Sequence, residues 1–136
     1  MATKRKQGKS SVHQAINEAE RLLPGVPSPD DEPDPRWQAI MEVGEYIETE
    51  PHEVWSFILK WGKHPSDDVR MAVASCLLEH LLEYHFQEYF HRVKVACKRN
   101  KRFADTFCNC LQFGQAEEPE NSKAFKALQG ELLRNL

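Results

Sequence analysis

Cysteine, histidine and glutamate side chains that could bind a metal ion stand on one predicted helix. Cys76 and His80 are one helical turn apart, and Glu83 follows three residues after His80. Thiolate, imidazole and carboxylate groups are the usual protein ligands of Zn²⁺. The same stripe also carries Leu77 and Tyr84, and a free cysteine is among the residues most often buried. The sequence therefore favours a core cysteine beside a hydrogen-bonded histidine, and we predict no metal and no cofactor.

Two further patterns that could support chemistry fail on helical geometry. The segment 80–85 is similar to a zinc-protease motif, but its histidines are five residues apart instead of four and diverge on a helix. Cys108 and Cys110 point about 200° apart around a helix, so they cannot share one ion, and we expect Cys110 to be the more buried. With no Ser-His-Asp order, glycine-rich phosphate loop or convergent carboxylate pair, we predict neither an enzyme nor a small-molecule substrate.

A run of basic residues is the main candidate binding site. It crosses the end of one predicted helix, a turn and the start of the next, and comprises Arg92, Lys94, Lys98, Arg99, Lys101 and Arg102. Cations stabilise a helix C-terminus, but the macrodipole disfavours the two that begin the second helix. The candidate ligands are a phosphate backbone or an acidic protein surface. Further basic residues near the N-terminus could extend this surface: Lys4, Arg5, Lys6 and Lys9.

Three aromatic residues on the predicted helix 51–61 form a second candidate surface, because tryptophan and other aromatic side chains anchor many interfaces. We expect Trp55 and Trp61 to lie in the seam between helix pairs. Phe57 points in a different direction from Val54 and Ile58, so it is retained as a candidate for partner binding.

Length, composition and charge limit the classes of protein to which this chain can belong. The chain has 136 residues, enough for one domain, and a formal net charge of −3. Nine acids against one base lie between Asp30 and Glu53, whereas the run 92–102 has no acid, so we expect one negative and one positive end. We found no apolar segment long enough for a signal sequence or a bilayer span. We therefore predict a soluble, unexported, cytoplasmic protein with no membrane partner and reduced cysteines.

Apolar periodicity predicts an all-α fold, because no segment alternates with a period of two. We expect a flexible basic tail over residues 1–10, a helical-repeat domain over 11–114 with a proline-rich linker at 24–35, and, over 115–136, a linker and a helix that caps the stack or docks into a partner. The predicted helices cover residues 11–23, 34–49, 51–61, 67–84, 86–97, 101–114 and 121–136.

A recurrence of 33 residues separates three cap-like residues, Asp34, Asp67 and Asn100, each followed by a helix-forming run. The run 67–74 resembles the second-helix signature of HEAT-type repeats, in which an aspartate, a Val-Arg pair and small residues recur. In the unit before it the arginine, Arg36, is one residue early. The resemblance implies a right-handed stack of three antiparallel helix hairpins plus a C-terminal helix.

The same resemblance implies a scaffold that presents helix surfaces to other macromolecules, with no chemistry of its own. In the unit that follows residues 67–74, Asp105 stands where the HEAT pattern has an alanine. The leading hypothesis is a noncatalytic protein–protein interaction module, such as an adaptor, an inhibitor or an immunity-type protein. The alternative is a nucleic-acid-binding accessory protein that uses the basic residues 92–102.

Overall fold

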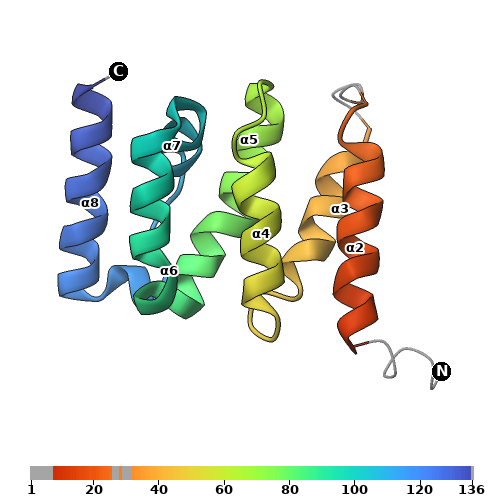
Figure 1. Cartoon of the computed structure of the whole chain (residues 1–136), viewed down its shortest axis with the longest axis horizontal. Coiled ribbons are helices and arrows are strands. Elements are labelled where there is room, and N and C mark those ends of the chain that lie inside the picture. Colours follow the sequence, from red (N-terminus) through yellow and green to blue (C-terminus); the bar gives the residue numbers. More distant parts are fainter. Residues whose placement is uncertain (1–7, 26–27, 29–31, 136) are drawn as a thin grey trace.

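The computed structural model describes residues 8–25, 28 and 32–135, and within these it is helical without any strand, which confirms the all-α prediction (Figure 1). Its α-helices are α2 (Gly8–Leu22), α3 (Pro35–Gly44), α4 (Pro51–Trp61), α5 (Asp67–Val73), α6 (Glu79–Arg99), α7 (Lys101–Cys108) and α8 (Pro119–Arg134). A π-helix, η1 (Ala74–Leu78), joins α5 to α6, and a 3-10 helix, η2 (Gly114–Glu117), precedes α8.

Helices that follow one another in the chain pack as neighbours, α2 on α3, α4 on α5, and α6 on α7. Each also contacts the next helix but one, so that α3, α5 and α7 are in contact in turn, as are α2, α4, α6 and α8. Figure 1 shows this succession along the long axis of the molecule, from α2 at one end to α8 at the other. The contacts define two layers, a first layer of α2, α4, α6 and α8 and a second layer of α3, α5 and α7.

Side-chain hydrogen bonds cap the starts of two second-layer helices, α3 and α7. The Asp34 carboxylate accepts a hydrogen bond from the Arg36 amide at 2.9 Å, and Pro35 occupies the first turn of α3, where it loses no hydrogen bond. The Asn100 side chain caps α7 in the same way through the Phe103 amide at 2.9 Å. The N-cap of α5 is Ser66. Asp34 and Asn100 are therefore N-caps as predicted, whereas the N-cap of α5 is one residue before the predicted Asp67 and its side chain makes no capping hydrogen bond.

Two buried arginines connect consecutive second-layer helices. Arg36 on α3 donates to Asp34 at 3.0 Å and also to Asp68 on α5, and it lowers the pKa of Asp34 through the first of these bonds. Arg70 on α5 donates to Asp105 on α7 at 3.2 and 3.1 Å. We call these bonds the arginine ladder. Arg36 and Asp105, which depart from the HEAT pattern in the sequence, are both members of it.

Several boundaries differ from the predicted ones. Residues 8–10 of the expected tail belong to α2, whereas residues 1–7, which include Lys4, Arg5 and Lys6, lie outside the described residues, as do positions 26, 27 and 29–31 of the linker. α3 ends at Gly44, where an added Cβ would lie 3.1 Å from the Cys76 carbonyl oxygen. α7 ends at Cys108 instead of residue 114, and the chain then runs without helix to Gly114, which has a φ of +52°.

The predicted helices 67–84 and 86–97 are continuous apart from η1 and a kink at His85, whose φ and ψ are −138° and 46°. The Gln115 side chain spans the kink, because its Oε1 accepts from the Phe86 amide at 2.8 Å and its Nε2 donates to the Tyr84 carbonyl at 2.8 Å. The His85 imidazole lies 2.9 Å from the Ile47 carbonyl oxygen. Polar groups from other segments therefore satisfy the backbone where helical hydrogen bonding is interrupted.

The core is one continuous apolar cluster to which every α-helix contributes side chains from its inner face. Its largest fully buried side chains include Tyr89, Phe103, Phe107 and Phe125, and Leu77 is fully buried on η1. No buried side-chain nitrogen or oxygen among the described residues lacks a hydrogen-bond partner. The helices are thus held by close packing together with a satisfied set of polar contacts.

Candidate basic groove

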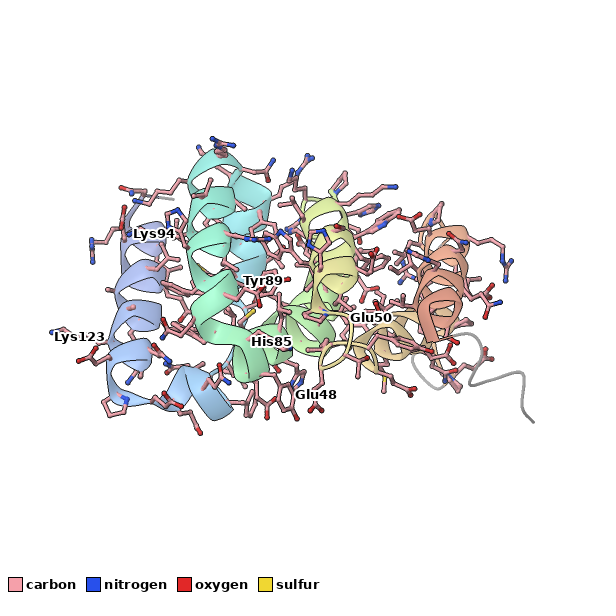
Figure 2. All side chains as sticks on the ribbon, turned by 60° about the horizontal axis from the view of Figure 1, so that its bottom comes forward. Glu48, Glu50, His85, Tyr89, Lys94 and Lys123 are labelled. Carbon is pink, nitrogen blue, oxygen red and sulfur yellow. The ribbon has the colours of Figure 1, made fainter. Side chains whose placement is uncertain are left out.

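The structure divides the predicted basic run between different sides of the molecule. Arg92 and Arg99 are seven residues apart on α6, so they share a helix face, and both line a groove between α4 and α6. Lys94 and Lys98 lie on another face of α6; Figure 2 shows Lys94 toward α8. Lys98 donates to Glu131 of α8 at 2.5 Å, so its charge serves the packing of these two helices.

The groove between α4 and α6, which we call the basic groove, has a volume of about 390 Å³. Its charged and polar wall comprises Lys63, His91, Arg92, Arg99 and Asn100, and its apolar floor comprises Trp55, Leu59, Val95 and Ala96. Trp55 is nearly buried and contacts the rings of Tyr89 and Phe103 at centroid distances of 5.9 and 6.0 Å. The floor is therefore continuous with the core through Trp55 and Ala96.

The cations of the basic groove are not neutralised within the described chain. Lys63, Arg92 and Arg99 are exposed, and no described carboxylate forms an ion pair with any of them. The Arg92 guanidinium lies over the ring of Tyr89, 5.1 Å from its centroid, a cation–π contact that leaves its charge uncompensated. The groove thus combines an uncompensated positive field with an apolar floor.

Positive charge continues past the groove onto the turn between α6 and α7. Lys101 and Arg102 are exposed and follow Asn100 directly. Burial lowers the pKa of His64, and the charges of Arg70, Arg36 and Arg102 lower it further. Burial and these charges both disfavour an imidazolium at His64.

Phe57 has to be removed from the candidate residues. It is 2% exposed and its ring lies 6.3 Å from that of Trp61, so it belongs to the core and cannot anchor a partner. Its different direction on α4 is explained by the packing of that helix on more than one side. Trp55 is buried too, whereas Trp61 is partly exposed and donates its indole N–H to Glu20 of α2 at 2.9 Å, in the seam between the two helices.

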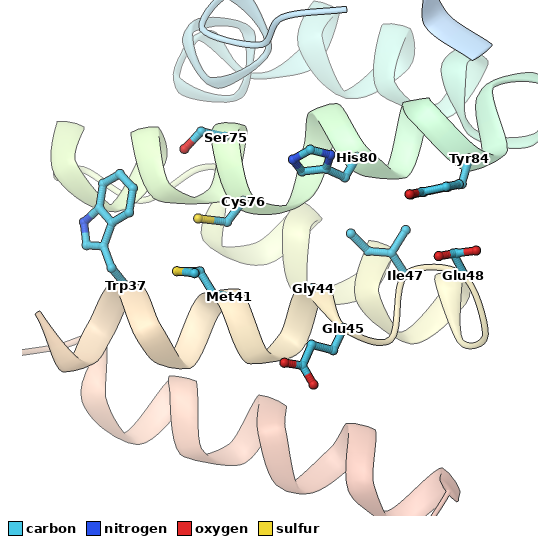
Figure 3. A pocket seen from close by; sticks show the side chains of 10 residues that line it. All are labelled: Trp37, Met41, Gly44, Glu45, Ile47, Glu48, Ser75, Cys76, His80 and Tyr84. Atoms are coloured by element: carbon cyan, nitrogen blue, oxygen red, sulfur yellow. The ribbon is translucent and has the colours of Figure 1, made fainter. Parts of the chain in front are cut away.

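The three residues considered as metal ligands are Cys76, His80 and Glu83, of which Figure 3 shows Cys76 and His80. His80 Nδ1 lies 2.7 Å from Glu83, and the imidazole stacks on Phe113 at a centroid distance of 5.6 Å. Cys76 is half-buried. Among the described residues no group of three or more His, Cys, Asp or Glu side chains is arranged to hold a metal ion.

Two groove residues were missed by the sequence analysis. Lys63 lies in the loop after α4 and His91 stands beside Arg92, and neither belongs to a conspicuous basic run. The helical spacing of Arg92 and Arg99 could have separated them from Lys94 and Lys98 in advance. The contribution of Lys63 depends on the packing of α4 against α6, which the sequence pattern alone does not give.

Comparisons of the chain with protein-family models, with curated proteins and with solved structures find no match. Within the described residues, no helix combines the length and the apolar character required to cross a bilayer.

Proposed function

We propose that this chain is a noncatalytic, HEAT-like interaction module of the cytoplasm whose basic groove binds an acidic segment of a protein partner. Such a partner would place carboxylates against Lys63, Arg92 and Arg99 and an apolar side chain over Leu59 and Val95, the partly exposed residues of the floor. An adaptor, an inhibitor or an immunity-type protein would each bind in this way. The module acts by presenting a surface, so it needs no catalytic group or cofactor.

The HEAT-like part of the proposal is supported by the pattern of helix contacts. Consecutive helices pair, alternate helices form two layers, and each arginine of the ladder reaches the aspartate of the following unit. Repeat proteins of this kind bury a continuous core only when several units stack, and they leave helix faces free for recognition.

One observation carries the binding part of the proposal: three cations without ion pairs surround an apolar floor. Solubility alone would not require these cations to surround a groove. Residues that anchor an interface, in contrast, are typically arginines and aromatic residues at the centre of a concave surface. An acidic partner gains affinity from the apolar contact and gains association rate from the positive field.

Nucleic acid is the alternative ligand of the same cations, and the floor of the groove argues against it. A single-strand-binding surface stacks bases on exposed aromatic rings. Trp55 is only 6% exposed and Tyr89 only 1%, so the aromatic rings of this groove offer little stacking surface. Lys98, which would otherwise enlarge the phosphate-binding surface, is occupied by Glu131.

The proposal is tested by selecting random displayed peptides on the wild-type chain, with the Arg92→Glu/Arg99→Glu variant as the counter-selection. We expect peptides in which Asp or Glu flanks a large apolar residue, and we expect the variant to bind them about tenfold or more weakly. The matched control is Lys94→Glu/Lys123→Glu, which makes the same change in charge at exposed positions outside the groove (Figure 2).

The selected peptides and a labelled single-stranded and duplex oligonucleotide are then titrated at about 50 and 200 mM salt, because phosphate contacts give steeply salt-dependent affinity. Oligonucleotide binding that requires Arg92 and Arg99 would favour the alternative. Failure to select acidic peptides, or equal losses in both double variants, would overturn the proposed site.

A further inference from the structure

A second groove, larger than the first, lies on the other layer of the molecule. It runs between α3 with its following turn on one side and η1 with the start of α6 on the other, and its volume is about 590 Å³ (Figure 3). We call it the acidic groove. Its residues differ entirely from those of the basic groove, so the two can be occupied independently.

Apolar side chains remain exposed along the acidic groove. Met41 on α3 is 55% exposed and Tyr84 on α6 is 42% exposed, although both are large and lie beside the core. Trp37 and Ile47 line the same groove, and Met71 on the adjacent α5 is also exposed. Clustered exposed apolar residues mark interaction sites more often than isolated ones do, and methionine adapts readily to a partner's shape.

The charge of this groove is negative. Glu45 and Glu48, in the turn after α3, line it, and none of the lining residues is a lysine or an arginine. Glu42 lies exposed on α3 outside the lining. No described cation forms an ion pair with these three carboxylates. Glu83 and then Glu48 raise the pKa of the Tyr84 hydroxyl, which places the aromatic edge of the groove within the same negative field.

The backbone of one wall of the groove is irregular at two places. Ser75 and Cys76 belong to the π-helix η1, and the kink at His85 directly follows Tyr84. π-Helical turns occur often at functional sites, since they widen a helix to present side chains that a regular turn would hide. This observation is independent of the charge and of the exposed side chains.

From these features we infer that the acidic groove docks a basic segment of a second protein partner, one in which lysines or arginines flank a large apolar side chain. The basic residues would pair with Glu45 and Glu48 at the rim, and the apolar side chain would cover Met41. The chain would then join an acidic partner on one layer to a basic partner on the other. Binding at the acidic groove does not depend on the proposed function of the basic groove.

The test selects random displayed peptides about 16 residues long on the wild-type chain, with Glu45→Lys/Glu48→Lys as the counter-selection. We expect clones that carry Lys or Arg on both sides of a large apolar residue. Their affinity should fall about tenfold or more in Glu45→Lys/Glu48→Lys and severalfold in Met41→Ser. It should stay within about twofold in Glu117→Lys/Glu120→Lys, the matched control at exposed positions outside both grooves.

Location is read from the methyl resonances of the chain labelled at its three methionines. A selected basic peptide should shift the Met41 signal, assigned by its disappearance in Met41→Leu. Enrichment of no basic clones, equal losses in the acidic-groove and control variants, or a peptide-bound spectrum with an unmoved Met41 signal would each overturn the inference. These results leave the Arg92→Glu/Arg99→Glu experiment unaffected, so failure at one groove is distinguishable from failure at the other.

Discussion

Replacing Arg70 by methionine tests whether the arginine ladder stabilises the stack. The guanidinium is nearly buried and donates to the carbonyl oxygens of His64 at 2.7 Å and Pro65 at 2.9 Å, as well as to Asp105 of α7 and to Asp67. Methionine keeps most of the aliphatic packing and removes all of these bonds. The substitution therefore isolates the polar connection between the loop before α5, α5 itself and α7.

The expected loss of unfolding free energy follows from the exposure of each partner. Each bond to a backbone carbonyl contributes about 1 kcal/mol. The Asp105 carboxylate is 44% exposed, so solvent screening limits that ion pair to about 1 kcal/mol. The Asp67 side chain is 91% exposed and is counted as nothing. The total is about 3 kcal/mol, which corresponds to a decrease in Tm of about 10 °C for a domain of this size.

The measurement is urea unfolding followed in parallel by far-UV circular dichroism and by tryptophan fluorescence. Asp67→Asn is the internal control, because the exposure of Asp67 predicts a change within about 0.5 kcal/mol. A loss below about 1 kcal/mol for Arg70→Met, or equal losses for the two variants, would refute the reasoning that the Arg70 guanidinium stabilises the fold through the loop before α5 and through α7.

Three further outcomes are expected. Gly114→Ala should lower the free energy of unfolding by about 2 kcal/mol or more, as measured in thermal melts. The reason is that φ is +52° and that the new Cβ would lie 2.7 Å from Glu83 Cγ and 2.9 Å from the Glu83 carbonyl oxygen. An unchanged Tm would show that the loop relaxes freely. Burial raises the pKa of the Glu79 carboxyl above 4.5, so the folded state binds the carboxyl proton more tightly than the unfolded state does. The free energy of unfolding should therefore fall as pH rises from about 4.5 through the raised pKa. Glu79→Gln should flatten that slope in urea midpoints measured across pH, and an unaltered slope would contradict it. Cys97 is buried, which raises its thiol pKa to about 12, whereas Cys108 is only half-buried. Iodoacetamide should therefore modify Cys108 well before Cys97, as followed by mass spectrometry. The opposite order would show local opening around α6.

The parts of the fold that the sequence predicted well are those governed by local chemistry. Asp34 with Pro35, and Asn100, are helix starts because their side chains and ring geometry satisfy the backbone within a few residues. The end of α7 was wrong for the opposite reason. Phe103 and Phe107 continue an apolar period that favours helix to residue 114, but the Leu111 amide bonds to the Glu79 carboxylate at 2.8 Å instead of to its own helix.

The candidate site was predicted as a sequence run and is found as a helix face. Arg92 and Arg99 belong together because α6 is regular between them, whereas Lys98 is drawn to Glu131, a residue distant in sequence. Lys63 joins the groove only through tertiary packing. Phe57 shows the same limit, since its burial depends on which faces of α4 are covered, and a single helical period could not decide that.

The amide of Gln115 has a consequence for how the molecule moves. A neutral amide can both accept from Phe86 and donate to Tyr84, a pairing that a carboxylate or an ammonium group could not reproduce. The side chain of Gln115, just before α8, therefore stabilises the bend in α6. Straightening the bend would break both of these bonds, and the carbonyl of Gln115 also accepts from Asn121 of α8 at 2.9 Å, so a change of shape at Tyr84 would disturb the contact with the last helix.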